Sequence, residues 1–252
     1  MKENIESCKN CGASLRAEDR FCASCGQRTK LGRLTFKEII SEFLSSVFNI
    51  DAPFPKTLTK MFFHPHRIIK EFINGKRKSY YAPVKYMVLC LFLNILIGEL
   101  AGFDPLENQR SIDTGAMDER SIQGYKAGEF LNRNLNFFLF ILPFSISFFT
   151  KIFFWRSGFN FAERTAMGFY LSGQFIVISL IPMMLSMLSP MLFYLMFPLC
   201  IFYFTYAFFK VFEMKMKFGR LILSFFSAFF SFFFYIFIGY SIAYTLTIYN
   251  IV

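Results

Sequence analysis

The sequence predicts an all-α polytopic membrane protein with a small cysteine-rich head, and three observations support this fold class. Long uncharged apolar runs follow Pro83, and 55% of the residues are hydrophobic, with 39 phenylalanines in 252 residues; ordinary soluble domains are less apolar. Four of the six cysteines lie within the first 25 residues, in two pairs. Basic connections alternate with acidic or uncharged ones, as expected when successive loops lie on opposite sides of a membrane.

The chain divides into three expected regions: a head at residues 1–30, cytosolic amphipathic and juxtamembrane helices at 31–82, and a transmembrane domain at 83–252. The polar N-terminus has no apolar segment of the kind found in a secretory signal peptide. We therefore expect the first membrane span to act as the insertion signal.

The head contains two copies of a metal-binding knuckle, Cys8-Lys-Asn-Cys11-Gly12 and Cys22-Ala-Ser-Cys25-Gly26, with ten residues between the pairs. Each glycine lets the backbone turn tightly, so that N–H groups point at sulfur. Four thiolates at this spacing are typical of a structural, tetrahedral Zn²⁺ site in a zinc ribbon, with no position left for a catalytic water. Iron in a rubredoxin-like site is the alternative with the same ligands, Cys8, Cys11, Cys22 and Cys25.

Metal binding is expected to supply the folding free energy of the head, because so short a segment buries little apolar surface. Paired thiols persist as metal ligands in a reducing compartment and tend to form disulfides when exported. The head therefore predicts a cytosolic N-terminus.

A helix is expected from Thr35 onward. Thr35 and Glu38 match a capping box, and Leu34 and Ile39 are placed for a hydrophobic staple. Apolar residues then recur at helical spacing as far as Phe48. Such a helix would lie in the membrane interface or dock on the domain behind it.

Two short juxtamembrane helices are expected next, Thr57–Phe63 and Pro65–Asn74, the second ended by Gly75. His64 and His66 flank a proline and are interpreted as interfacial side chains. The basic and tyrosine-rich stretch that follows favours anchoring at the cytosolic headgroups. The alternative is a specific anionic-lipid or phosphate site at Lys76, Arg77 and Lys78.

Five spans are expected, each long enough to cross about 30 Å of hydrocarbon. They lie at residues 84–103, 135–155, 166–188, 191–212 and 221–249. Between Glu99 and Arg133, seven acids stand against four bases, whereas residues 151–165 and 210–220 are basic. The connections therefore predict an N-in, C-out topology in a bacterial inner membrane.

Few polar residues lie within the spans, which argues against a transport pathway. Asn94, Glu99 and Gln174 are the candidates, and each is interpreted first as an interhelical hydrogen-bonding residue. Pro143, Pro182 and Pro198 are expected to kink their helices. The small residues of the fifth span favour packing within the molecule over a dimer interface, although an oligomer stays possible. The sequence has no recognisable catalytic motif, so an enzyme is not expected.

The cysteine knuckles, the segment from Thr57 to Pro65, and the segment from Ile69 through Arg77 to Pro83 together resemble a widespread bacterial family of integral membrane proteins, classed as a domain of unknown function. The resemblance covers about the first 86 residues well and the spans in general hydropathy. It implies an N-terminal zinc ribbon and a multi-span tail, and no activity.

These features favour a membrane-embedded adaptor or scaffold, whose zinc ribbon docks a protein partner in the cytosol or the membrane while the spans lie in the lipid bilayer. The alternative is a transporter or channel subunit with a ligand site within the spans. Nucleic-acid binding is not favoured, because the few basic residues of the head are interspersed with Glu18 and Asp19.

Overall fold

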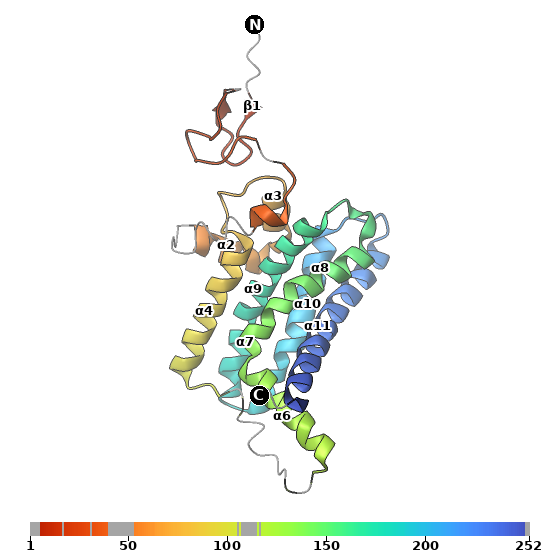
Figure 1. Cartoon of the computed structure of the whole chain (residues 1–252). Helices are drawn as coiled ribbons and strands as arrows, with labels where there is room; N and C mark the ends of the chain where they lie inside the picture. The colour runs from red at the N-terminus through yellow and green to blue at the C-terminus, as the bar shows by residue number, and fades with distance from the viewer. Residues whose placement is uncertain are drawn as a thin grey trace.

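The structure is a computed structural model that describes residues 6–16, 18–30, 32–39, 53–104, 106, 115 and 117–249. It is mostly helical: a bundle of long apolar helices carries the small cysteine-rich module beyond one end, while the C-terminus lies at the opposite end (Figure 1). The part of the expected helix at residues 40–48 and most of the acidic connection after the first span lie outside the described residues.

The cysteine module contains two short antiparallel strands, β1 (Glu6–Ser7) and β2 (Ser14–Leu15). An isolated bridge joins Phe21 to Arg28. Cys8, Leu15 and Cys22 form a small apolar cluster of their own. Three such residues bury little apolar area.

The segment that follows the module docks on the bundle. The expected capping box is present, with Thr35 N donating to Glu38 Oε2 at 3.1 Å and Glu38 N donating to Thr35 Oγ1 at 3.4 Å. Residues 36–39 are helical. Leu34 and Ile39 are buried in the main hydrophobic cluster, which is the docking alternative expected for this segment.

The two short juxtamembrane helices are α2 (Pro53–Phe63) and α3 (Pro65–Ile73). Pro65 occupies the first turn of α3, where its missing N–H costs no hydrogen bond. Gly75 follows with a φ of 109°, a conformation that a side chain disfavours, and so ends the helix as expected. A salt bridge of 2.6 Å between Lys70 and Glu213 joins α3 to the loop between the last two spans.

Among the described residues, five segments are long and apolar enough to cross a membrane, as expected. The first is α4 (Pro83–Ala101), and the second combines α7 (Leu135–Phe138), the 3₁₀ segment η1 (Leu139–Ile141) and α8 (Leu142–Phe153). The third is α9 (Phe161–Ser186). The fourth combines η3 (Pro190–Leu195) with α10 (Met196–Val211), and the fifth is α11 (Lys217–Ile248).

Three helix starts differ from the expected boundaries. Helix α2 begins at Pro53 rather than at Thr57. Helix α9 begins at Phe161 rather than at residue 166, because Asn160 and Glu163 form a capping box ahead of the apolar run. Helix α11 begins at Lys217 rather than at residue 221. Hydropathy locates the apolar stretch and not the polar first turn that precedes it, so the expected starts of α9 and α11 lie a few residues too late.

The prolines act differently in the different spans. Pro143 stands in the first turn of α8, directly after the 3₁₀ segment η1, so the second span is irregular ahead of it. Pro198 likewise lies in the first turn of α10, and Pro182 lies inside α9. A first-turn proline loses no helical hydrogen bond, whereas Pro182 does.

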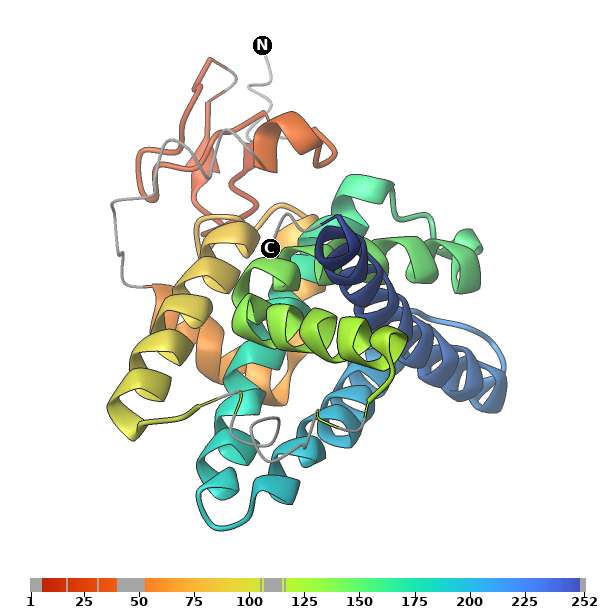
Figure 2. The same ribbon diagram turned by 60° about the horizontal axis from the view of Figure 1, so that its bottom comes forward.

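Helix α6 (Glu119–Arg133) is a feature that the sequence analysis treated only as part of a loop. It lies across the end of the bundle against α11, at the end away from the cysteine module (Figure 2). It is polar, with only Ala127 fully buried among its side chains, so it has no apolar stripe that would reveal it in the sequence.

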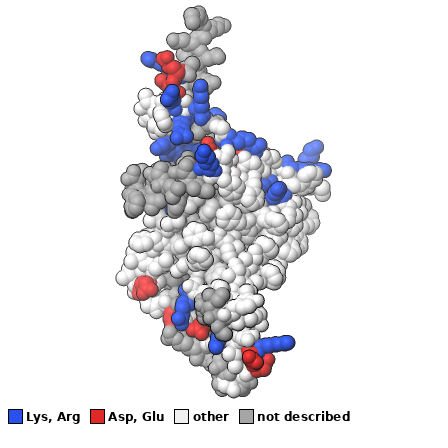
Figure 3. Space-filling view, in the orientation of Figure 1, with Lys and Arg blue, Asp and Glu red and all other residues white. Residues whose placement is uncertain are grey.

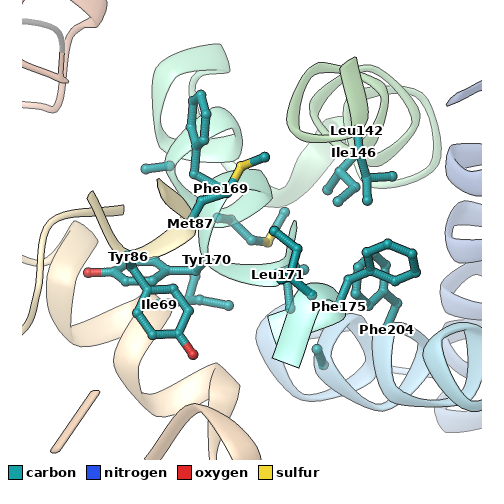
Figure 4. Packing of buried hydrophobic residues seen from close by; sticks show 14 of the residues in the cluster. Ile69, Tyr86, Met87, Leu142, Ile146, Phe169, Tyr170, Leu171, Phe175 and Phe204 are labelled. Carbon is teal, nitrogen blue, oxygen red and sulfur yellow. The ribbon is translucent and has the colours of Figure 1, made fainter. Parts of the chain in front are cut away.

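Helix α9 is the centre of the bundle. In the apolar stretch of α9, 67% of the residues are buried inside the protein, against 17% in the corresponding stretch of α4. Tyr170 and Phe175 point from α9 toward opposite sides, Tyr170 toward Tyr86 and Ile69, and Phe175 toward Phe204 (Figure 4). The core is therefore built around the third span, while the other spans expose apolar side chains outward, as lipid contact requires.

Candidate metal centre

The first cysteine knuckle is held by its own backbone. Cys8 N donates to Ala13 O and Gly12 N donates to Cys8 O, both at 2.8 Å. The second knuckle repeats both bonds at the same distance, fourteen residues later. Gly12 and Gly26 have φ of 80° and 68°, so both knuckles need glycine at this position. The duplication in the sequence therefore corresponds to a duplication in structure.

The four cysteine sulfur atoms all lie within 4.8 Å of one another. Cys8 Sγ lies 3.7 Å from Cys25 Sγ, and Cys11 Sγ lies 3.6 Å from Cys22 Sγ. A tetrahedral site with metal–sulfur bonds of about 2.3 Å places its sulfurs about 3.8 Å apart. The cysteines form no disulfide. The site therefore fits one metal ion held by four thiolates.

The backbone of the first knuckle favours the thiolate at Cys8. Burial would raise the pKa of the Cys8 thiol, but hydrogen bonds from the backbone of Cys11 and Asn10 outweigh it and lower the pKa to about 7. At Cys11, a backbone hydrogen bond from Ala13 would lower the pKa, but desolvation and the neighbouring thiols raise it to about 12. Thiolate is the metal-binding form of cysteine. Cys8 and Cys22 are buried, while Cys11 is exposed at the surface of the module.

The module is attached to the juxtamembrane loop through Gln27, which is buried, and through Asn10. Gln27 Nε2 donates to Gly75 O at 2.8 Å, while Gln27 Oε1 accepts from the N–H groups of Arg77 and Lys78 at 3.1 and 3.3 Å. On the first knuckle, Asn10 Oδ1 accepts from both the N–H and the hydroxyl of Ser79, at 2.9 and 2.7 Å. Both knuckles therefore hold the loop at residues 75–79.

The basic residues of this loop face acidic neighbours. The Arg77 side chain is 7% exposed, and its Nη1 lies 3.5 Å from Glu38 Oε2. Lys76 Nζ lies 3.4 Å from Glu71 Oε2. Lys78 is exposed. Two of the three bases expected to bind an anion are thus engaged with carboxylates, and an anion site at Lys76, Arg77 and Lys78 stays a prediction.

Glu71 is the acidic centre of this region. Its carboxylate accepts from Tyr80 Oη at 2.6 Å and from Arg67 Nε at 3.0 Å, and it also faces Lys76. Partial burial would raise the pKa of Glu71, but these partners lower it to about 2. Burial and the same carboxylate raise the pKa of Tyr80 to about 12. At neutral pH the group is a charged carboxylate bonded to a neutral phenol.

Two of the three polar residues within the spans join helices. Asn94 Nδ2 on α4 donates to Ile176 O on α9 at 3.3 Å. Gln174 Oε1 on α9 accepts from Tyr86 Oη on α4 at 2.6 Å, while its buried Nε2 has no hydrogen-bond partner among the described residues. Both match the interhelical role that the sequence favoured. Glu99 is exposed near the end of α4, away from the cysteine module.

Arg164 is a buried residue that the sequence analysis did not single out. It is 1% exposed, and its guanidinium donates to Thr150 O, Phe154 O and Ser157 Oγ at 2.6, 2.8 and 2.7 Å. These groups lie at the C-terminal end of α8 and in the turn after it, where Thr150 O and Phe154 O also accept from the N–H groups of Phe154 and Ser157, so Arg164 supplies each carbonyl with a second donor. The preceding Asn160-x-x-Glu163 pattern was the available signal for a helix start here.

Residues 51–94 match a protein family described as "Protein of unknown function (DUF3667)". No curated protein and no solved structure matches the chain. The matched residues include α2, α3, the loop held by the cysteine module and the first part of α4. The chain is therefore similar to this family in its juxtamembrane region and first candidate span.

Proposed function

We propose that the chain is a membrane-embedded adaptor, in which a structural zinc ribbon presents a docking surface for a cytosolic or membrane protein partner. The observation that supports the proposal is that the cysteine module is both attached to the rest of the chain and carries an exposed aromatic side chain. Gln27 and Asn10 fix it to the juxtamembrane loop, while Phe21 on the second knuckle is 56% exposed. A fixed module with an exposed aromatic residue is suited to recognition, because aromatic side chains dominate binding at interfaces.

The metal of this proposal is Zn²⁺, held by Cys8, Cys11, Cys22 and Cys25. Zinc supplies structural cross-linking of the two knuckles, and all four ligand positions are protein thiolates. Elemental analysis of the purified full chain should find one zinc per chain, and Cys22→Ser/Cys25→Ser should abolish it. Stoichiometric iron, with the visible absorption of an iron–thiolate centre, would contradict the assignment.

In this proposal the chain lies in a bacterial inner membrane, with its N-terminus in the cytosol and its C-terminus outside. Lys and Arg gather around the module and the adjoining end of the bundle, an uncharged zone follows, and acidic and basic residues are mixed at the other end (Figure 3). Positive charge favours the cytosolic side. A cytosolic module is also consistent with thiols that form no disulfide.

The test is purification of the full chain in mild detergent, with identification of stoichiometric partners by mass spectrometry. Wild type, Phe21→Ser and Met216→Ser are compared. Met216 is the matched control, because it is an exposed apolar side chain (72% exposed) in the loop between α10 and α11, at the same end of the bundle. A partner retained by wild type and Met216→Ser and lost from Phe21→Ser supports the proposal.

A chain that purifies without any stoichiometric protein, equally well in all three forms, contradicts the adaptor function. The alternative of a transporter or channel subunit receives less support, because Asn94 and Gln174 are engaged between α4 and α9. It predicts loss of a transport phenotype on Glu99→Gln or Asn94→Leu, with the cysteine module dispensable.

A further inference from the structure

Two lysines of α2 share one aromatic ring at the module end of the bundle. The Nζ atoms of Lys56 and Lys60 lie 5.8 and 5.7 Å from the centroid of the Tyr80 ring. Residues four apart lie on one face of a helix, so both ammonium groups gather beside the same ring. The ring attracts each cation, but two like charges at this spacing repel each other.

No carboxylate in the described part of the chain forms a salt bridge with Lys56 or Lys60. Glu71 accepts a hydrogen bond from the hydroxyl of Tyr80, and its charge is balanced by Arg67 and Lys76. The two ammonium groups therefore carry positive charge that no carboxylate of the described residues neutralises, and an anion between them would remove their repulsion.

The two tyrosines of this site, Tyr80 and Tyr81, are held in place by the fold. Tyr80 and Tyr81 are 4% and 7% exposed. Tyr81 N donates to Thr57 Oγ1 at 3.0 Å, and Tyr170 Oη of the central helix donates to Tyr81 O at 2.6 Å. The rings are thus held before any ligand arrives, which lowers the entropic cost of binding.

The neighbouring ring carries a third ammonium. Lys85 Nζ, in the first turn of α4, lies 5.6 Å from the centroid of Tyr81. Helix α4 begins at Pro83 and is the first candidate span. Under the N-in orientation, lysines and tyrosines at this position stand at the depth of the cytosolic headgroups, where both residue types are favoured.

We propose that Lys56 and Lys60, above the Tyr80 ring, bind the phosphate of an anionic phospholipid headgroup, with Lys85 beside it. Each ammonium donates to phosphate oxygens as a compact point charge. A zwitterionic headgroup offers the same phosphate, but its own cation offsets the charge, so the site should select anionic lipid. The site differs from the one expected at Lys76–Lys78, and it does not depend on the adaptor function.

The experiment uses the full chain in neutral detergent. Phosphatidylglycerol, phosphatidylcholine or inorganic phosphate is added in turn, and binding is measured by native mass spectrometry and by the shift in thermal unfolding. Lys56→Gln/Lys60→Gln is compared with Lys215→Gln/Lys217→Gln. This control removes the same charge from exposed residues at the same end of the bundle.

Phosphatidylglycerol should bind wild type and the control alike, and each lysine removed from the site should weaken it about fivefold. Lys56→Arg/Lys60→Arg should retain binding, and if the double glutamine variant does not fold, Lys60→Gln alone is measured. Equal weakening by the control pair would show general surface attraction and overturn the site. Equal binding of phosphatidylcholine would remove its selectivity, and equal competition by inorganic phosphate would make free phosphate the ligand and overturn the lipid assignment.

Discussion

Glu71 ties α3 to the loop before the first candidate span, through Tyr80, Arg67 and Lys76. Its carboxyl group has a pKa of about 2 in the folded chain, against an ordinary value of 4.5. A lowered folded pKa stabilises the native state above the unfolded pKa, and this stabilisation is lost as the pH falls through the folded pKa.

Glu71→Gln should therefore lower the free energy of unfolding by up to about 3 kcal/mol at neutral pH. The difference from wild type should shrink as the pH falls from 4.5 toward 2. This difference is measured by unfolding both proteins in detergent over this pH range. Metal loss in acid affects both forms alike, so it does not change the difference. Glu119→Gln, at an exposed position of α6, should show no such pH-dependent difference. A constant gap at all pH values would contradict the assignment.

Gln27 is the single side chain that satisfies three backbone groups of the 75–78 loop. Gln27→Ala removes all three bonds: Gly75 O and Arg77 N keep the hydrogen bond that joins them to each other, whereas Lys78 N loses its bond, at a cost of about 1–3 kcal/mol. Hydrogen exchange of the amides at residues 75–79 should accelerate about tenfold or more, because local opening becomes easier. The metal content should stay at the wild-type value, since no ligand is changed. Gln123→Ala on α6 is the control, and unchanged exchange in the Gln27 variant would contradict the predicted coupling.

Among the helices, α9 depends most on a close approach to its neighbours. A Cβ atom added to Gly168 would lie 2.4 Å from Pro143 O and 2.9 Å from Pro143 Cα. These are backbone atoms of α8, so they cannot move aside as the end of a side chain can. Glycine at this position therefore sets the spacing between α8 and α9.

Gly168→Ala should destabilise the chain by about 1–3 kcal/mol, because the overpacked helices must separate. Gly98→Ala is the matched control: its nearest neighbour would be Met183 Sδ at 3.8 Å, an ordinary contact. Alanine favours helix over glycine, so this variant should be neutral or slightly stabilised. Thermal unfolding of both variants in detergent decides the matter, and equal midpoints would show that α8 and α9 tolerate the methyl group.

For the whole molecule, the charge distribution predicts which end faces the cytosol. The bundle end next to the module gathers Lys and Arg, and the uncharged zone separates it from the other end, where acidic and basic residues are mixed (Figure 3). Alkaline phosphatase fused after the last span should be active, because this enzyme folds in the oxidising periplasm. A green fluorescent protein fused to the N-terminus should fluoresce. The opposite pair of results would reverse the proposed orientation.

The sequence by itself determined the features that depend on local spacing. The duplicated knuckles predicted the cluster of Cys8, Cys11, Cys22 and Cys25, because metal ligands on tight turns need fixed intervals. Apolar runs predicted five candidate spans, because a helix that crosses the hydrocarbon needs an uninterrupted apolar run of a minimum length. The Thr35–Glu38 capping box is local for the same reason.

Only the tertiary structure decided which distant residues meet. Gln27 pairs with a loop about fifty residues away, and Arg77 turns toward Glu38, so a run of bases that looks free in sequence is partly neutralised. The pairing of Lys56 and Lys60 with Tyr80 is likewise created by the fold of α2 against the loop before α4. Such contacts depend on how helices pack, and helix packing is set by the shapes of whole surfaces rather than by spacing along the chain.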